Sequence, residues 1–332
     1  MHIQQRRAGG CTDWPRKSGQ KVLMQTATAA LFSCGSALCF VCLYYSFFSQ
    51  DCKPCTPRHK RFFCLILFFY RICDTIKIMK GVIRMKVEYY KEYSFSLARD
   101  MEFKVFGRGG KPVLAVPCQA GRFYDWENFG MVETLQDFLE TGQIQLFCVD
   151  SIDNETLFAP GDPAQRARGQ EAYYHYVIDE LVPRIQTING TGRKLLATGC
   201  SMGAYHAANF FFRRPDIFDS VIALSGIYDT HEFFGDYMDD LVYANDPCAC
   251  VRGMPWDHPY RELYANSKII LCVGQGDWEG PLLEGTRRMN AALQQKGIPA
   301  WVDYWGYDVS HDWPWWKKQL VYFLPYVLND IV

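Results

Sequence analysis

The pattern of apolar and polar positions divides the chain near residue 85. After that point, short and nearly continuous apolar runs recur, which is typical of strands buried on both faces of a parallel sheet. Segments with helical spacing of apolar residues lie between them. The runs are 112–116, 145–149, 194–198, 220–224 and 268–273, and the helical segments are 131–140, 170–186, 202–214, 283–296 and 313–328. This alternation predicts one doubly wound α/β domain with right-handed crossovers.

The pattern also predicts strands at both ends of this domain. Residues 87–98 and 102–107 are rich in Tyr, Phe and Val, and they predict an antiparallel pair with a turn around Arg99 and Asp100. Residues 300–305 predict a last strand. Two stretches, 151–166 and 227–266, match neither strand nor helix. Long irregular segments are usually lids or binding loops, so we expect both where the strands end.

Residues 1–84 lack strand or helix periodicity. No charged residue occurs between positions 22 and 50, and the stretch 28–48 is apolar and long enough to span a bilayer. Basic residues flank it on both sides, so the charge distribution indicates no orientation. We favour the interpretation that this leader is upstream sequence read in frame, with the functional start at Met79 or Met85. The alternative is a membrane anchor through residues 28–48.

The cysteines mark the same boundary. Eight of the 14 precede residue 85, and the other six are spread through the rest of the chain. This distribution argues against a disulfide framework and favours a cytoplasmic domain, residues 85–332, with reduced thiols. If residues 28–48 are an anchor, the domain is instead attached to a membrane. Cys52, Cys55, His59 and Cys64 have the side chains of a zinc site, but their crowded spacing argues against one.

The composition excludes other classes of protein. The 35 Lys and Arg residues nearly balance the 36 Asp and Glu residues, giving a formal net charge of −1 and arguing against a nucleic-acid partner. Hydrophobic residues make up 49% of the chain, which is too many for a disordered protein. We therefore expect a globular domain that acts on a small molecule. No sequence feature sets an oligomeric state.

One motif carries a nucleophile. The predicted strand 194–198 leads into Gly199-Cys200-Ser201-Met202-Gly203, and a helical segment follows at once. This is G-x-S-x-G in the strand–turn–helix context of a nucleophile elbow. The glycines allow close packing of helix against strand, while Ser201 is forced onto a sharp turn. The neighbouring Cys200 is predicted to be a small buried filler.

A serine needs a base and an acid to become a nucleophile, and their order along such chains is Ser, acid, His. His311 follows the last predicted strand and precedes the last helix, as the base should. His206 lies five residues after Ser201 on the same helix, where packing or hydrogen bonding is expected. The acid should follow the penultimate strand, where both Asp277 and Glu279 stand. Asp277 is favoured by position, whereas Glu279 has the longer reach.

The oxyanion of a tetrahedral intermediate needs two backbone donors. One is predicted to be the N–H of Met202, directly after the nucleophile. The other comes from the loop after strand 112–116. In that loop we favour Gln119, with Cys118 as the neighbouring candidate.

The segments LATGCSMGAYHAA (196–208), VDSID (149–153), GQGDWE (274–279) and SHDWPWW (310–316) resemble the putative esterase (esterase D-like) family of α/β hydrolases. The resemblance covers about residues 86–330. It implies the α/β-hydrolase fold, with a mostly parallel sheet, antiparallel N-terminal strands and helices on both faces. It also implies hydrolysis of acyl esters with no metal or organic cofactor. Similar sequences often have Ala in place of Asp277 and keep the Glu two positions later, so both carboxylates remain candidates.

These observations predict a serine carboxylesterase that cleaves small-molecule esters through an acyl-enzyme. One alternative is an acyltransferase on the same triad. Another is a non-catalytic module that binds carbohydrate through its aromatic rim. Several tryptophans fall in predicted loops or near the motifs, where they could line a cleft for an apolar acyl group or a sugar ring. They are Trp126, Trp256, Trp278, Trp305, Trp313, Trp315 and Trp316, and at least one of the last two is expected in the core.

Overall fold

The computed structural model describes residues 85–329. The predicted leader 1–84, with its candidate membrane segment 28–48, lies outside the described residues. Within residues 85–329, none of the helices has the length and apolar character needed to cross a membrane.

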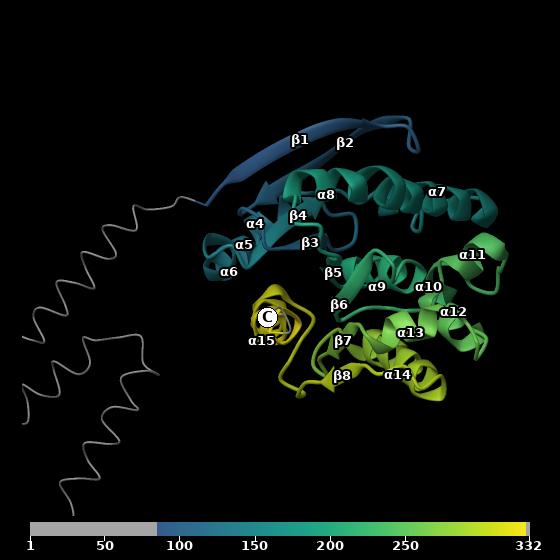
Figure 1. The fold of residues 1–332 in the computed structure, drawn as a ribbon. Coiled ribbons are helices and arrows are strands. Elements are labelled where there is room, and N and C mark those ends of the chain that lie inside the picture. The colour runs from purple at the N-terminus through teal and green to yellow at the C-terminus, as the bar shows by residue number, and fades with distance from the viewer. Residues whose placement is uncertain (1–84, 330–332) are drawn as a thin grey trace, which may run out of the picture. The chain divides into compact units, whose positions relative to one another are not determined.

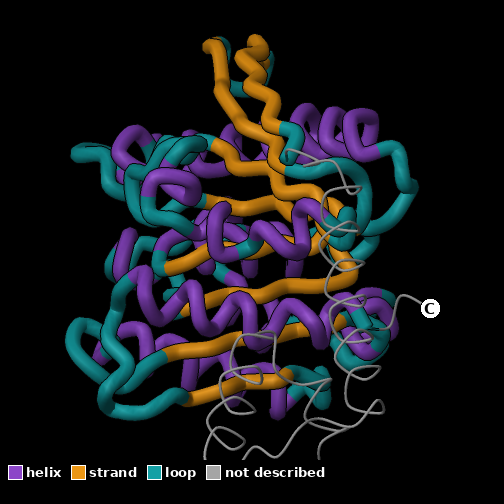
Figure 2. Tube along the Cα trace, turned by 90° about the vertical axis from the view of Figure 1, so that its left-hand side faces the viewer, coloured by secondary structure: helices purple, strands orange, loops and turns teal. Residues whose placement is uncertain are grey.

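Eight strands form one sheet in the order β1-β2-β4-β3-β5-β6-β7-β8. β1 and β2 are antiparallel, β2 is antiparallel to β4, and the strands from β4 to β8 are parallel to one another. The β1–β2 hairpin extends beyond the rest of the sheet (Figure 2). This is the predicted mostly parallel sheet with antiparallel N-terminal strands. The strands are β1 (Val87–Ser94), β2 (Arg99–Phe106), β3 (Lys111–Val116), β4 (Ile144–Val149), β5 (Leu195–Cys200), β6 (Phe218–Leu224), β7 (Lys268–Val273) and β8 (Trp301–Tyr304).

Helices cover both faces of this sheet, so the fold is that of an α/β hydrolase, as predicted. In Figure 1, α4 to α6 and α15 lie on one side of the strands, and α8, α9 and α14 lie on the other. The helices are α4 (Asp125–Asn128), α5 (Met131–Thr134), α6 (Gln136–Glu140), the 3-10 helix η1 (Asp153–Glu155), α7 (Pro163–His175), the π-helical turn η2 (Tyr176–Leu181), α8 (Val182–Asn189), α9 (Met202–Arg213), α10 (His231–Phe234), α11 (Asp240–Ala244), α12 (Pro247–Gly253), α13 (Tyr260–Ala265), α14 (Gly280–Gln295) and α15 (Trp313–Leu328).

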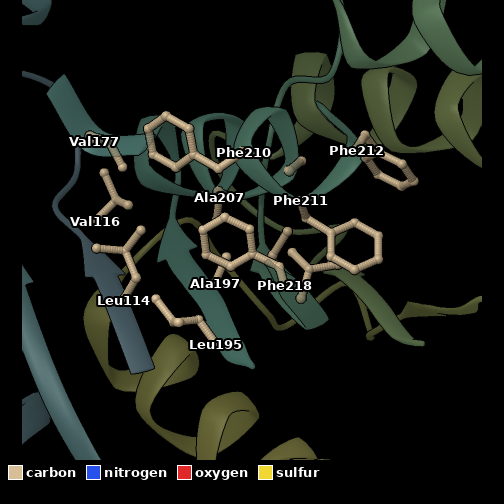
Figure 3. Close-up of a cluster of buried hydrophobic side chains, with 14 of the residues drawn as sticks. Leu114, Val116, Val177, Leu195, Ala197, Ala207, Phe210, Phe211, Phe212 and Phe218 are labelled. Carbon is tan, nitrogen blue, oxygen red and sulfur yellow. The ribbon is translucent and has the colours of Figure 1, made fainter. Parts of the chain in front are cut away.

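The central strands are buried on both faces because their apolar side chains alternate between two cores. On β5, Leu195 and Ala197 belong to the same core cluster as Phe210 and Phe211 of α9 (Figure 3). Leu196, between them, belongs to the opposite core with α15. Every residue of β3, β4 and β5 is buried. The continuous apolar runs in the sequence follow from this burial.

Several predicted boundaries are wrong. β1 ends at Ser94, and Arg99 and Asp100 belong to β2, because the chain turns at residues 95–98, where Ala98 has a φ of 51°. The helix predicted from residue 170 begins at Pro163. Asp162 caps it by accepting hydrogen bonds from the N–H groups of Ala164 and Gln165.

Two other predictions differ from the structure: one predicted helix is divided, and one segment predicted to be irregular is helical. The predicted helix 131–140 is divided into α5 and α6 at Leu135. The segment 227–266, predicted to be irregular, contains the four short helices α10 to α13. Helices of four to seven residues are too short to produce a recognisable apolar period.

Candidate active site

Ser201 stands at the sharp turn between β5 and α9. Its backbone has φ 57° and ψ −121°, a conformation that costs free energy in a non-glycine residue. The turn leaves no room for side chains on its two glycines. A Cβ on Gly199 would lie 2.2 Å from the carbonyl carbon of Gly203, and a Cβ on Gly203 would lie 2.4 Å from the oxygen of Val116. The G-x-S-x-G spacing is thus required by packing on both sides of the serine.

His311 and Glu279 lie in line with this serine. The Nε2 atom of His311 is 2.9 Å from the Ser201 Oγ, and its Nδ1 atom is 3.3 Å from an Oε atom of Glu279. The Glu279 side chain is 1% exposed, and that of His311 is 18% exposed. Of the two predicted acids, the structure places Glu279 against the histidine. Asp277 is an exposed residue whose backbone oxygen, not its carboxylate, accepts a hydrogen bond from the His311 N–H.

The loop that carries Glu279 is joined to the loop that carries His311. Besides the bond to Asp277, the N–H of Gln275 donates to the oxygen of Gly306 at 3.2 Å, and the N–H of Gly276 donates to that of Val309 at 2.9 Å. The β7–α14 loop and the β8–α15 loop are therefore held together by backbone hydrogen bonds. This arrangement fixes the separation between the carboxylate and the imidazole.

Ser225 holds the second oxygen of Glu279, a contact that the sequence analysis missed. Its hydroxyl donates to Glu279 Oε1 at 2.6 Å and accepts a hydrogen bond from Trp316 Nε1 at 3.1 Å. The indole of Trp316 also packs edge-on against the His311 ring, with 4.8 Å between the centroids. Ser225 is the first residue after β6 and has a φ of 54°. The sequence feature that could have identified Ser225 is its position at the carboxyl end of a parallel strand, where α/β sheets bind ligands.

A cavity of about 180 Å³ opens beside the serine. Both segments predicted to be binding loops contribute to its wall, which is mostly apolar. The lining residues are Gln119, Phe158, Ser201, Met202, Ile227, Glu232, Phe233 and Leu282. Phe158 and Phe233 pack edge to face, with 5.5 Å between their centroids. The arrangement offers an acyl group an apolar site next to the hydroxyl.

The two predicted oxyanion residues, Met202 and Gln119, line this same cavity. Met202 is the first residue of α9, so its N–H has no acceptor within the helix. Gln119 follows Cys118 in the loop after β3. Burial raises the pKa of the Cys118 thiol to about 12, so this neighbour is a protonated thiol at neutral pH.

His206 does not reach Ser201 but forms a buried pair with Asp153. Its Nε2 atom lies 2.7 Å from Asp153 Oδ1, and both side chains are at most 1% exposed. The other oxygen of Asp153 accepts a hydrogen bond from the backbone N–H of Ala120, next to Gln119. The sequence analysis predicted packing or hydrogen bonding for His206 but did not single out Asp153. As with Ser225, the sequence feature that could have identified Asp153 is its position shortly after a parallel strand, here β4.

The tryptophans occupy different environments. Trp126 and Trp316 are buried, so Trp316 is the expected core residue, whereas Trp278 is 85% exposed. Trp313 stacks on the partly exposed Phe129, with 4.8 Å between the ring centroids. Cys200 is fully buried, as predicted for a small filler.

Within residues 85–329, no three His, Cys, Asp or Glu side chains are grouped so that they could hold a metal ion. The six cysteines of the range are free thiols.

Comparison with solved structures gives three examples of the same fold. A ferulic acid esterase is 20% identical, with a TM-score of 0.58, over 74% of this chain and 98% of that chain. Fluorophosphonate-binding serine hydrolase F from Staphylococcus aureus, with substrate bound, is 14% identical with a TM-score of 0.57, over 74% of this chain and 99% of that chain. An S-formylglutathione hydrolase from Agrobacterium tumefaciens is 15% identical with a TM-score of 0.57, over 74% of this chain and 98% of that chain.

These identities are low, so the likeness to the three structures establishes the fold alone. No curated protein sequence matches the chain. A family model described as putative esterase, by contrast, matches residues 94–327. That range contains the serine elbow, the buried glutamate and the histidine loop. By this match, which covers more than half of its length, the chain belongs to the putative esterase family.

Proposed function

We propose that the protein is a serine carboxylesterase in which Ser201 is the nucleophile, His311 the general base and Glu279 the acid that orients it. The observation that carries the proposal is the contact of 2.9 Å between Ser201 Oγ and His311 Nε2. A serine hydroxyl is a weak nucleophile unless a base accepts its proton, and this imidazole is within hydrogen-bond reach. The carboxylate on Nδ1 favours the tautomer whose Nε2 atom is free to accept that proton.

In the first half of the reaction, Ser201 Oγ attacks the acyl carbon while its proton passes to His311 Nε2. The carbonyl π bond opens, and its electron pair forms an oxyanion stabilised by the N–H groups of Met202 and Gln119. The tetrahedral intermediate collapses when the bond to the alkoxy group breaks. His311 then returns the proton to the departing alcohol, which leaves an acyl-enzyme on Ser201.

In the second half, water replaces the alcohol. His311 takes a proton from the water as its oxygen attacks the acyl carbon, and a second oxyanion forms in the same site. Its collapse breaks the bond to Ser201 Oγ, which recovers the proton from His311. The products are a carboxylic acid and the starting enzyme.

The cavity indicates which acyl groups fit. A dry engineered cavity of about 150 Å³ is large enough to hold benzene, and the cavity beside Ser201 measures about 180 Å³. We therefore propose an uncharged acyl group of about six carbon atoms or fewer in this site. The carboxylate of Glu232 on the lining disfavours acyl groups that carry a negative charge.

The decisive test is activity of the full chain and of Ser201→Ala on p-nitrophenyl esters from acetate to octanoate, together with fluorophosphonate labelling. We expect labelling of the peptide that contains Ser201, hydrolysis that declines beyond hexanoate, and loss of both in Ser201→Ala. Ser267→Ala is the matched control, since Ser267 Oγ bonds to the oxygen of Leu263 and does not line the cavity.

Three outcomes would contradict the proposal. If Ser201→Ala hydrolyses the esters at the parent rate, Ser201 is not the nucleophile. If the parent chain is neither labelled nor active on any ester, the fold serves as a binding module. If acyl transfer to an added alcohol outpaces release to water, the enzyme is an acyltransferase on the same residues.

A further inference from the structure

One buried carboxylate connects three separate elements near the cavity. Asp153 belongs to η1, shortly after β4, and its side chain is 1% exposed. Its Oδ1 atom faces His206 Nε2 on α9 at 2.7 Å. Its Oδ2 atom accepts the Ala120 N–H from the loop after β3 at 3.0 Å. Neither partner has a role in the proposed proton transfers.

The His206 side of this connection is rigid. The imidazole is fully buried, and the rings of Tyr173, Tyr205 and Phe210 pack around it with centroids 5.1 to 6.0 Å from its own. The hydrogen bond between His206 Nε2 and Asp153 Oδ1 joins α9 directly to η1. In such a dry setting a hydrogen bond is stronger than in water, so this bond helps to fix the carboxylate in place.

The Ala120 side of the connection is strained. Ala120 has a φ of 52°, in the left-handed region that alanine seldom adopts. Such a conformation persists when the surroundings hold it, and the hydrogen bond to Asp153 does so from the next loop. Gln119, the residue directly before it, lines the cavity with Ser201. The orientation of the peptide that carries the Gln119 N–H thus depends on the backbone that Asp153 fixes.

We infer that Asp153, held by His206, is a positioning residue for the oxyanion site. It fixes the loop of Gln119 relative to α9, whose first residue is Met202, so that the two backbone N–H groups converge on one carbonyl oxygen. This inference rests on the proposed function, because it concerns the same oxyanion. It gives the buried His206 a part in catalysis that requires no contact with the substrate.

The test compares an ordinary p-nitrophenyl butyrate with its thionoester, in which sulfur replaces the carbonyl oxygen. Sulfur accepts hydrogen bonds weakly, so turnover of the thionoester depends less on the oxyanion donors. For Asp153→Ala we expect kcat on the oxygen ester to fall about tenfold to a hundredfold, with KM within about twofold. The fall on the thionoester should be several-fold smaller.

Two further variants keep the test decisive. Asp153→Asn should restore most of the activity, because its amide oxygen can accept the Ala120 N–H and its NH₂ group can donate to His206 Nε2 when the ring hydrogen is on Nδ1. His206→Phe keeps a ring but removes the hydrogen-bonding nitrogen, and it should shift the ratio of the two esters in the same direction as Asp153→Ala. If Asp153→Ala does not fold, His206→Phe decides. Tyr264→Phe, which removes a buried hydrogen bond to the oxygen of Phe212, controls for a general loss of stability.

The inference is overturned if the variants leave kcat unchanged, or if they lower turnover of both esters by the same factor, as a purely structural role would. Labelling and activity of the parent chain are measured first. If these are absent, the proposed function fails. If they are present and the ratio of the two esters does not change, only the positioning role fails.

Discussion

Two histidine–carboxylate pairs lie in the region of Ser201, and they differ in what the second ring nitrogen of the histidine contacts. His311 and Glu279 are 3.3 Å apart, and the second nitrogen of His311 lies against the serine hydroxyl. His206 and Asp153 are closer, at 2.7 Å, but the second nitrogen of His206 is buried with no partner among the described residues. The shorter and drier pair is therefore the one without access to the nucleophile.

This difference shows that the contact between a histidine and a carboxylate does not by itself indicate a base. A base needs a second nitrogen that reaches the reacting proton, and some exposure so that substrate and water can approach. The side chain of His311 is 18% exposed, while that of His206 is 0% exposed. This contrast supports the proposal that the first pair transfers protons and the second positions the oxyanion loop.

The largest effect that separates the two pairs is expected for His311→Ala. Removing the imidazole that contacts Ser201 Oγ should lower kcat on p-nitrophenyl butyrate by about 10⁵- to 10⁶-fold. Steady-state kinetics of His311→Ala beside His206→Phe measures the contrast. A loss in His206→Phe as large as that in His311→Ala would remove the distinction between the pairs.

Glu279→Gln should have the next largest effect. An amide on Nδ1 no longer stabilises the imidazolium and favours the wrong tautomer, so kcat should fall by about 10³- to 10⁴-fold. Asp277→Asn is the matched control and should stay within about twofold, because that carboxylate does not contact His311. The opposite ranking of the two variants would make Asp277 the acid.

Ser225→Ala tests the contact behind Glu279, the proposed catalytic acid. The change removes a hydroxyl that donates to Glu279 and leaves Trp316 Nε1 without its acceptor. A hydrogen bond to a charged group contributes about 1.5–3 kcal/mol, so we expect kcat to fall roughly tenfold to a hundredfold. Ser225→Thr keeps the hydroxyl and should recover part of the rate. An unchanged kcat in Ser225→Ala would show that Glu279 needs no such support.

The smallest effect is expected from thiol modification beside the oxyanion loop. Burial raises the pKa of Cys118 to about 12. The reactive thiolate forms only as the pH approaches that value, so its fraction at pH 8 is far below about 1%. Iodoacetamide at pH 8 should leave esterase activity unchanged, and peptide mapping should find Cys118 alkylated only in the denatured chain. Rapid alkylation of the folded chain with loss of activity would contradict this.

The apolar pattern predicts the doubly wound α/β architecture well because the central strands are buried on both faces, and the family resemblance adds the α/β-hydrolase fold. Their runs, such as 194–198 and 220–224, are short and nearly continuously apolar, which is typical of strands in a parallel sheet. The sequence also places Ser201 and His311 correctly at strand ends. Boundaries that depend on local capping, such as the start of α7 at Pro163, were predicted less well.

The choice between Asp277 and Glu279 could not be made from the sequence for a physical reason. Trp278, the residue between them, has a φ of 68°, and this left-handed backbone turns the chain so that Asp277 faces solvent and Glu279 faces inward. Residue types do not reveal such a turn when the left-handed residue is not glycine. The contacts of Asp153 and Ser225 were missed because their partners, such as His206 on α9 and Trp316 on α15, are far from them in the sequence.

The backbone hydrogen bonds between the β7–α14 and β8–α15 loops also constrain how the enzyme can change during evolution. A substitution in one loop shifts the carbonyl or N–H that the other loop uses, so mutations in the two loops should not be additive. A Cβ on Gly274, for example, would lie 2.1 Å from the oxygen of Val309. The effect of a substitution in either loop will therefore depend strongly on the sequence of the other loop. Mutant libraries that aim to change this region will have to vary both loops together.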